Sequence, residues 1–340
     1  MTTAAPSAPP AAPGSVEATA ARLAALLTGS ATAMSDAGGR GDLEFEPVIG
    51  LRRLGRGEPP VETWAVDGGQ ITVADARCLV VTAIRAARVR FRDGECSLEE
   101  EGDVRVHVLG PGEHDAARAS LGLAGVLASD CAVDANLVRD RWEWEAVERS
   151  IEDAVPGALV LVDGDLQPDW RIPSSFLSRL LDRAAERGVV LAAVTKHSSL
   201  ARGGAPLLGQ LELEAATLYG TRATWWASIG TVRRDVGPAG SGIQVVAARL
   251  DPDAPFAFRI DLPGDADAEA VLSSLVAVSD DAAFPGYPYP LAVADRLAAC
   301  PGWVRSEVRM QLDDLLDRAG VPPEVRDRAF ADRHALMERS

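Results

Sequence analysis

Lysine is almost missing from this chain of 340 residues. Of the 34 basic residues, Lys196 is a lysine and all the others are arginines. Arginine does not replace lysine where a compact, strongly hydrated ammonium group is needed, because the guanidinium is planar and more weakly hydrated. A lysine retained against so strong a bias indicates a position that needs this charge. Lys196 is therefore a candidate functional residue, with chance survival as the alternative.

Cysteine and histidine are also scarce, with four of each. Neither type shows the spacing of a zinc site, which argues against the common zinc-binding motifs. The scattered cysteines fit a reducing compartment and predict a cytoplasmic location. No run of about 18 apolar residues occurs, so no membrane-spanning helix is expected. Residues 1–14 lack the basic start and apolar core of a signal peptide and are expected to form a disordered tail.

Positive charge is in deficit, since the net charge at pH 7 is −16. Phosphate contacts normally need a basic surface, so this balance disfavours unaided binding to nucleic acid. A nucleic-acid function would need a bound metal, a local basic patch or a partner. The apolar fraction of 47% and the charged fraction of 25% are those of an ordinary globular protein with one large or two modest domains.

The order of the expected elements indicates an α/β fold. A short amphipathic helix at 15–28 and a linker at 29–42 precede strand-like runs over 61–66, 77–91 and 104–109. Helices and strands then alternate, which predicts a mixed sheet with a central antiparallel meander and flanking helices. The later elements are expected at 133–154 (helix), 158–162 (strand), 174–187 (helix), 189–195 (strand), 243–262 (hairpin), and 266–279, 291–299, 303–319 and 323–337 (helices).

Two of the strand-like runs, 64–69 and 159–165, end in an aspartate followed directly by glycine. Glycine permits a sharp turn, which would leave the carboxylates of Asp67 and Asp163 at the ends of their strands. Strand ends are where α/β folds gather their chemistry. Two carboxylates on neighbouring strands repel each other unless a metal or a proton lies between them. The pair therefore predicts a divalent metal site, and two ordinary Asp-Gly turns are the alternative.

The helix expected before the second aspartate offers a third carboxylate. At about 100° per residue, Glu143 and Glu148 fall on opposite edges of its apolar stripe, and Glu145 points away. Glu143 is preferred because Trp142 and Trp144 flank it and suggest a more buried turn. Glu148 is the alternative, and three solvated glutamates would be the ordinary outcome. The stripe is set by Leu137, Trp144, Val147, Ile151 and Ala154.

Lys196 follows the apolar strand predicted before it, where an ammonium could stabilise charge on a phosphoryl group or orient water. The segment 284–290 contains three prolines and must be an extended loop. Tyr287 and Tyr289 in this loop could contact phosphate or stack on a base, or could simply pack the loop against the core. Asp295, in the helix that follows, is a further inward-facing carboxylate candidate.

Taken in order, five motifs resemble the NurA nuclease family over roughly residues 45–300. The resemblance implies an RNase H-like core with a helical C-terminal extension, and a metal-dependent deoxyribonuclease. It implies 5′–3′ exonuclease and single-strand endonuclease activity in DNA end resection and repair. It also implies a homodimer docked on a hexameric HerA-type ATPase. The motifs are Ala-Val-Asp-Gly-Gly (65–69), the helix glutamate, Leu-Val-Asp-Gly-Asp (161–165), Thr-Lys-His-Ser (195–198) and Gly-Tyr-Pro-Tyr-Pro-Leu-Ala-Val-Ala-Asp-Arg-Leu (286–297).

Carried over to this sequence, the resemblance gives each motif residue a role. Carboxylates suit Mn²⁺, with Mg²⁺ as the alternative, rather than zinc. The implied domains are a tail, helix and linker over 1–42, the nuclease domain over 43–300 and the helical extension over 301–340. Asp67, Glu143 and Asp163 would hold the metal, and Lys196, Tyr289 and Asp295 would surround the substrate phosphate.

Three positions depart from the family pattern. Gly69 and Asp165 each stand where serine is usual, and Asp295 stands where some members carry histidine. These departures leave room for a second hypothesis, a ring subunit that has lost metal binding and acts as a scaffold for the ATPase. A third, a metal-dependent phosphatase acting on small molecules, ranks lowest because no phosphate-binding glycine-rich loop opens a helix.

Overall fold

The computed structural model describes residues 15–29, 31–37, 43–123, 127, 130–166, 171–233 and 242–331. The predicted tail over 1–14 lies outside the described residues, as does the end of the helix predicted over 323–337. Within the described ranges, no helix combines the length and the apolar character needed to cross a lipid bilayer.

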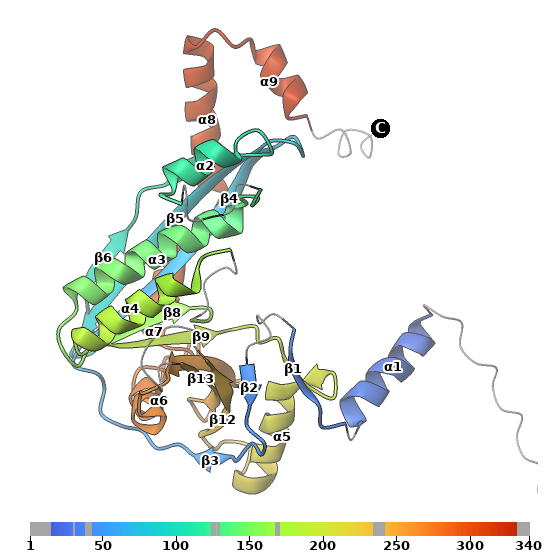
Figure 1. Cartoon of the computed structure of the whole chain (residues 1–340), viewed down its shortest axis with the longest axis vertical. Helices are drawn as coiled ribbons and strands as arrows, with labels where there is room; N and C mark the ends of the chain where they lie inside the picture. The colour runs from blue at the N-terminus through green and yellow to red at the C-terminus, as the bar shows by residue number, and fades with distance from the viewer. Residues whose placement is uncertain are drawn as a thin grey trace, which may run out of the picture.

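One large mixed sheet organises the fold (Figure 1). Its strands follow the order β2-β12-β13-β14-β9-β8-β4-β5-β6, with β3 paired to β12 and β7 paired to β5. The pairs β4–β8 and β8–β9 are parallel, and the other pairs are antiparallel. The strands are β2 (Leu43–Phe45), β3 (Arg52–Arg53), β4 (Thr63–Asp75), β5 (Val80–Arg92), β6 (Glu95–Glu101), β7 (Arg105–Leu109), β8 (Leu159–Asp163), β9 (Val190–Thr195), β12 (Trp225–Val232), β13 (Ile243–Arg249) and β14 (Phe258–Pro263).

Helices cover both faces of this sheet, and alternation along the strands decides which side chain meets which helix. On β4, Trp64 and Val66 pack with α3 (Ala135–Asp153) and α4 (Ser174–Glu186). Ala65, between them, packs with α6 (Ala268–Val276) and α7 (Tyr289–Ala298) on the opposite face. On β8, Val160 and Val162 share the α3 face, and Leu159 and Leu161 share the α7 face. The sheet is thus the middle of three layers.

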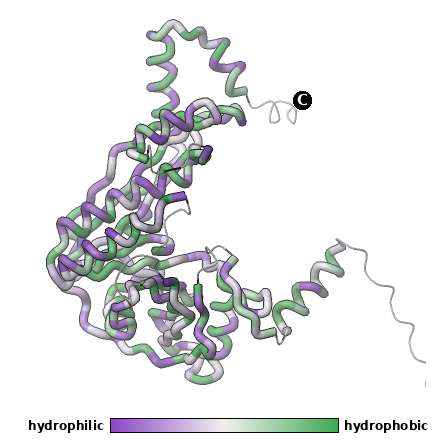
Figure 2. The backbone as a smooth tube through the Cα atoms, viewed as in Figure 1, coloured by the Kyte–Doolittle hydropathy of each residue, from purple (hydrophilic) through white to green (hydrophobic). Residues whose placement is uncertain are grey.

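The remaining elements lie around this core. The helix α8 packs Val304 and Val308 against Val73, Val81 and Ala83 of the long strands. It extends with α9 beyond those strands at one end, and α1 projects from the region of β1 at the other (Figure 1). Hydrophilic and hydrophobic residues are interspersed along α8 and α9 (Figure 2). These elements are α1 (Val16–Thr28), β1 (Met34–Asp36), α2 (His114–Ser120), β10 (Leu200–Arg202), β11 (Ala205–Pro206), α5 (Leu207–Tyr219), α8 (Gly302–Arg318) and α9 (Pro323–Ala329).

Two differences from the sequence prediction have physical causes. The segment predicted as a linker contains β1, which pairs with β10 and brings Asp36 to a buried arginine, Arg259. The strand predicted over 61–66 does not stop at Asp67 but continues to Asp75 as part of β4. The antiparallel partner β5 supplies hydrogen bonds along this whole length, so the Gly68-Gly69 pair stays extended.

Candidate active site

Asp67 and Asp163 lie side by side on the two parallel strands in the middle of the sheet. The β4–β8 register pairs Val66 with Val162, so the next residue on each strand is an aspartate. Val66 and Val162 face α3, so the two aspartate side chains point to the opposite face, which carries α7, because side chains alternate along a strand. Gly164 after Asp163 has φ +117°, a conformation that favours glycine, and β8 ends there. The prediction of a turn is correct for the second Asp-Gly and wrong for the first.

A third aspartate reaches this pair from α7. One carboxylate oxygen from each of Asp67, Asp163 and Asp295 lies within 4.8 Å of the other two. Asp67 and Asp163 are half-buried and Asp295 is exposed, so the group opens to solvent on one side. Oxygen ligands from several carboxylates suit a hard divalent cation. The three aspartates therefore form a candidate metal-binding group at the α7 face of the sheet.

Lys196 lies beside these carboxylates at the end of β9. Its Nζ atom is 2.7 Å from Oδ2 of Asp163 and 2.9 Å from Oδ1 of Asp295. The two carboxylates raise the pKa of Lys196 although burial acts in the other direction, so the side chain is an ammonium at neutral pH. The sequence prediction placed Lys196 near the aspartates, and the structure brings them into direct contact.

Glu143 approaches the group from the opposite face, on α3. Its carboxylate lies against Gly68, where a Cβ atom would come within 3.0 Å of it. The side chain is 11% exposed, and its Oε1 is 3.5 Å from Nε of Arg139. Burial raises the pKa of Glu143 to about 7 despite Arg139, with Asp140 and Asp163 adding to the rise. Glu143 thus borders the three aspartates without belonging to the set whose oxygens all lie within 4.8 Å.

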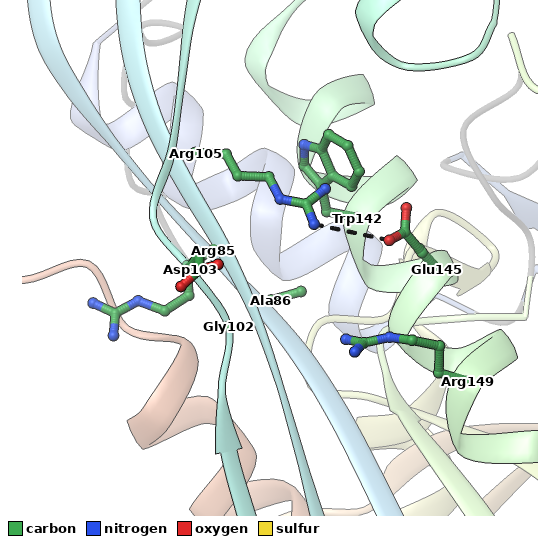
Figure 3. A pocket seen from close by; sticks show the side chains of 8 residues that line it. All are labelled: Arg85, Ala86, Gly102, Asp103, Arg105, Trp142, Glu145 and Arg149. Atoms are coloured by element: carbon green, nitrogen blue, oxygen red, sulfur yellow. Dashed lines mark ion pairs between the residues drawn. The ribbon is translucent and has the colours of Figure 1, made fainter. Parts of the chain in front are cut away.

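Glu145 and Glu148, the other two glutamates weighed from the sequence, lie elsewhere, as their positions on α3 require. Glu145 faces a small pocket between α3 and the strands β5 and β7, where its Oε1 is 3.8 Å from Arg105 (Figure 3). The Arg105 guanidinium lies over the ring of Trp142 at 3.5 Å. Glu148 is half-buried one turn further along the helix. Between the alternatives left open by the sequence, the structure places Glu143 beside the aspartates.

The negative charge at this site exceeds the positive charge close to it. The pKa of Asp67 is raised to about 8, first by burial and then by the charges of Asp163 and Glu143. A carboxyl group with such a pKa keeps its proton at neutral pH unless a cation stabilises the carboxylate. The chemistry of the site therefore fits a divalent cation, which would supply the missing positive charge.

The two tyrosines of the proline-rich loop have separate environments. The prediction that Tyr289 surrounds the substrate phosphate does not agree with its position, because its ring packs against Phe91 at 5.0 Å. Burial raises its pKa, and its charged neighbours are Asp280 and Arg56. Tyr287 instead lies under Lys196, whose Nζ is 5.0 Å from the ring centroid. The helix α7 begins at Tyr289, and this change of backbone direction sends the two side chains to different places.

The Tyr287 hydroxyl is a buried polar group next to the carboxylates. Tyr287 is 7% exposed, and its hydroxyl lies beside the Asp163 carboxylate but forms no well-aligned hydrogen bond among the described residues. Burial raises its pKa, and the charges of Asp163, Asp67 and Asp295 raise it further. A buried hydroxyl without a partner is costly. Its position beside the aspartates makes it a candidate hydrogen-bond donor to a bound group.

No protein-family model matches the chain, and no curated protein matches its sequence. Among solved structures, it is similar to the NurA nuclease from Sulfolobus solfataricus, with a TM-score of 0.52 and 15% identity over 79% of this chain and 88% of that chain. The fold is NurA-like. This confirms the predicted class, an RNase H-like mixed sheet with an antiparallel meander and flanking helices.

Two further structures are similar over comparable lengths. A second NurA structure gives a TM-score of 0.43 at 9% identity, covering 73% of this chain and 86% of that chain. The catalytic domain of human endonuclease V gives a TM-score of 0.40 at 18% identity, covering 77% and 85%.

Two departures from the NurA pattern have a local structural reason. A Cβ atom at Gly69 would come within 3.0 Å of the Ala298 carbonyl at the end of α7, so a side chain there would push α7 away. Asp165 lies close to a buried cluster around Arg259. Burial lowers the pKa of this guanidinium, and the charges of Asp261, Asp165 and Asp36 together raise it above its ordinary value. Neither departure removes a carboxylate from the candidate metal site.

Proposed function

We propose that this chain is a metal-dependent DNA nuclease that hydrolyses phosphodiester bonds. The observation that carries the proposal is the group Asp67, Asp163 and Asp295, whose carboxylate oxygens lie within 4.8 Å of one another beside the only lysine of the chain. The NurA-like fold supports the reaction class, since the similar Sulfolobus protein is a nuclease.

The aspartates and Glu143 would hold the metal, with Mn²⁺ favoured and Mg²⁺ as the alternative. When bound, the metal supplies an activated water at neutral pH and stabilises the charge that develops on the oxygens of the phosphate. Lys196 contributes a fixed positive charge at the same edge, and the buried Tyr287 hydroxyl offers a hydrogen bond to a phosphate oxygen. The contact with the substrate phosphate that the resemblance implies for Tyr289 is therefore proposed for Tyr287 instead.

The partner and the cleavage mode belong to the same proposal. With a net charge of −16, the isolated chain should capture DNA weakly and in a strongly salt-dependent way. We infer that a hexameric HerA-type ATPase feeds DNA to a homodimer of this chain in the cytoplasm, for DNA end resection and repair. Activity would be 5′–3′ exonucleolytic and endonucleolytic on single strands. Residues 43–300 would form the nuclease domain, and 301–340 its helical extension.

An assay on end-labelled DNA tests this function. Purified protein is incubated with single- and double-stranded substrates in Mn²⁺, Mg²⁺ or EDTA. The proposal expects cleavage of the single strand with Mn²⁺, weaker cleavage with Mg²⁺ and none with EDTA. Equal cleavage in Mn²⁺ and in EDTA would show that the metal is not involved.

A scaffold that has lost metal binding is the competing function, and one observation favours it. The Lys196 ammonium lies between Asp163 and Asp295, where a cation is expected in the nuclease. Thermal unfolding with and without Mn²⁺ separates the two functions, because a ligand that binds the folded state raises the melting temperature. A nuclease should melt later with Mn²⁺, and a scaffold that cannot bind metal should melt at the same temperature.

A further inference from the structure

A pocket of about 360 Å³ opens next to the carboxylates, within the range of roughly 300–1,000 Å³ that is usual for small-molecule sites. Lys196 and Asp295 belong both to this pocket and to the candidate metal site. They are its charged lining residues and are paired with each other, so the pocket carries little net charge. The other lining residues are Pro255, Phe256, Phe258, Ala283, Phe284, Pro285, Tyr287 and Ala292.

Aromatic rings form a continuous row from the mouth of the pocket to the carboxylates. Phe256 meets Phe258 edge to face at 5.2 Å, and Phe258 meets Tyr287 at 5.6 Å. The Lys196 ammonium then lies 5.0 Å from the Tyr287 ring and contacts the aspartates. A flat aromatic ligand in the pocket would therefore stand directly beside a group bound at the carboxylates.

The rings at the mouth are exposed to solvent in a way that their packing does not explain. Phe256 is 48% exposed and Phe284 is 58% exposed, and they come from two separate loops that meet at this pocket. Single exposed apolar residues are common, but two phenylalanines on the rim of one apolar pocket indicate a binding surface. The buried Tyr287 hydroxyl, which lies beside the Asp163 carboxylate, is at the inner end of the same row.

We propose that this pocket binds the unpaired base of the nucleotide whose phosphate lies at the carboxylates. The proposal rests on the proposed nuclease function and specifies its substrate as single-stranded DNA or a frayed end. Every base has a π face that stacks on aromatic side chains without regard to sequence. A base within a duplex is already stacked and paired and would have to leave the helix to enter. A charged ligand has no counter-ion here, because Lys196 and Asp295 neutralise each other.

Binding measurements with base-bearing and abasic DNA test the pocket. A fluorescent thymidine oligonucleotide and an abasic oligomer of equal length are titrated at low salt with Mn²⁺ onto the Asp67→Asn variant, which should not cleave them. The base-bearing strand should bind about 5- to 150-fold more tightly, the range expected from stacking of one base. Equal affinity for the two strands would overturn the proposal without any further variant.

Substitutions at the rim give the second arm. Phe256→Ala with Phe284→Ala in the same Asp67→Asn background should abolish the preference for the base-bearing strand. The matched control is Trp303→Ala, which removes an aromatic side chain that is 61% exposed on α8, away from the pocket. The control should keep the full preference. A double variant that keeps it as well would place the bases elsewhere and overturn the proposal.

The outcome can be separated from that of the nuclease proposal. If the unsubstituted protein cleaves nothing but its Asp67→Asn variant still prefers the base-bearing strand, the pocket is supported and the catalytic proposal fails. If cleavage occurs and binding ignores the base, the nuclease stands and the pocket proposal is wrong.

Discussion

Two clusters of acidic side chains lie next to each other at the ends of the central strands, and they differ in what balances their charge. Asp163 belongs to the candidate active site, and Asp165, two residues later, lies close to the second cluster around Arg259. In that cluster the guanidinium binds both oxygens of Asp261 at 2.8 and 3.1 Å and one oxygen of Asp36 at 3.1 Å. A bidentate arginine of this kind is a fixed structural partner.

Exposure separates the two clusters further. The side chains of Arg259, Asp261 and Asp36 are at most 3% exposed, so no ligand reaches them. Lys196 is 37% exposed and Asp295 is 55% exposed, so the active-site cluster can exchange its counter-ion with solvent. Buried carboxylates alone therefore do not define a metal site, because those around Arg259 are fully paired and closed to solvent. A candidate metal site differs in that its negative charge is not balanced by fixed cations and its carboxylates are open to solvent.

Removing the arginine should have the largest effect on stability. Arg259→Met leaves Asp36 and Asp261 buried without their partner, and we expect a loss of about 3–5 kcal/mol in the free energy of unfolding. Urea unfolding measures this loss. The comparison is Lys196→Met in the active-site cluster. Its loss of unfolding free energy should be much smaller, because water reaches the carboxylates that contact Lys196. Equal losses would mean that the two clusters play the same structural role.

Glu143 and Glu145 offer a matched pair on one helix. Glu143→Gln should lower the rate of DNA cleavage by about 10- to 100-fold, the usual cost of disturbing groups around a metal. Glu145→Gln should leave the rate unchanged, since that side chain faces Arg105 at the start of β7, away from the aspartates (Figure 3). The measurement is the initial rate at which each variant cleaves labelled DNA. Two equal rates would exclude Glu143 from the site.

Gly69→Ser tests whether the close packing of α7 on β4 holds Asp295 in the active-site cluster. The new side chain would overlap the Ala298 carbonyl, and we expect a loss of about 1–3 kcal/mol together with weaker Mn²⁺ binding. Gly55→Ser is the control, because nothing lies within 4 Å of a Cβ atom at that position. Thermal unfolding with and without Mn²⁺ gives both quantities. Normal stability in Gly69→Ser would show that α7 can shift without cost.

The pH dependence of stability tests the protonation of Asp67 in the active-site cluster. The pKa of Asp67 in the folded chain is about 8, above its ordinary value of 3.8, so the folded state holds a proton that the unfolded state releases between these values. The contribution is complete below about pH 4 and is lost as pH rises through 8. In EDTA, unfolding free energy should therefore fall over this window. The fall should be shallower in Asp67→Asn, and an identical slope would remove Asp67 as its source.

The sequence predicts the fold and much of the site because both follow from short periodic patterns. The apolar runs of β8 and β9 end at Asp163 and just before Lys196, which places both at neighbouring strand ends, and helical periodicity selects Glu143 over Glu145. Gly68 and Gly69 are harder to interpret. They resemble a turn, yet their lack of side chains serves the close approach of α3 and α7 within a continuous strand.

Other features depend on contacts between segments that are distant in the sequence. The role of Tyr287 depends on where α7 begins, which a loop with three prolines does not specify. The partner of Asp261 is Arg259 on its own strand, but Asp36 joins them only through the pairing of β1 with β10. The aromatic pocket combines Phe256 and Phe284 from two loops, and neither loop has a pattern that predicts the other.

Cleavage of end-labelled single-stranded DNA by the unsubstituted protein and by Asp67→Asn tests the central claim most directly. The claim is that Asp67, Asp163 and Asp295 form the metal centre of a nuclease. With Mn²⁺, we expect cleavage by the unsubstituted protein and a rate lower by about 1,000-fold or more for Asp67→Asn, since a metal contributes several kcal/mol to such a reaction. EDTA should stop cleavage. Asp67→Asn cleaving at the rate of the unsubstituted protein would contradict the account.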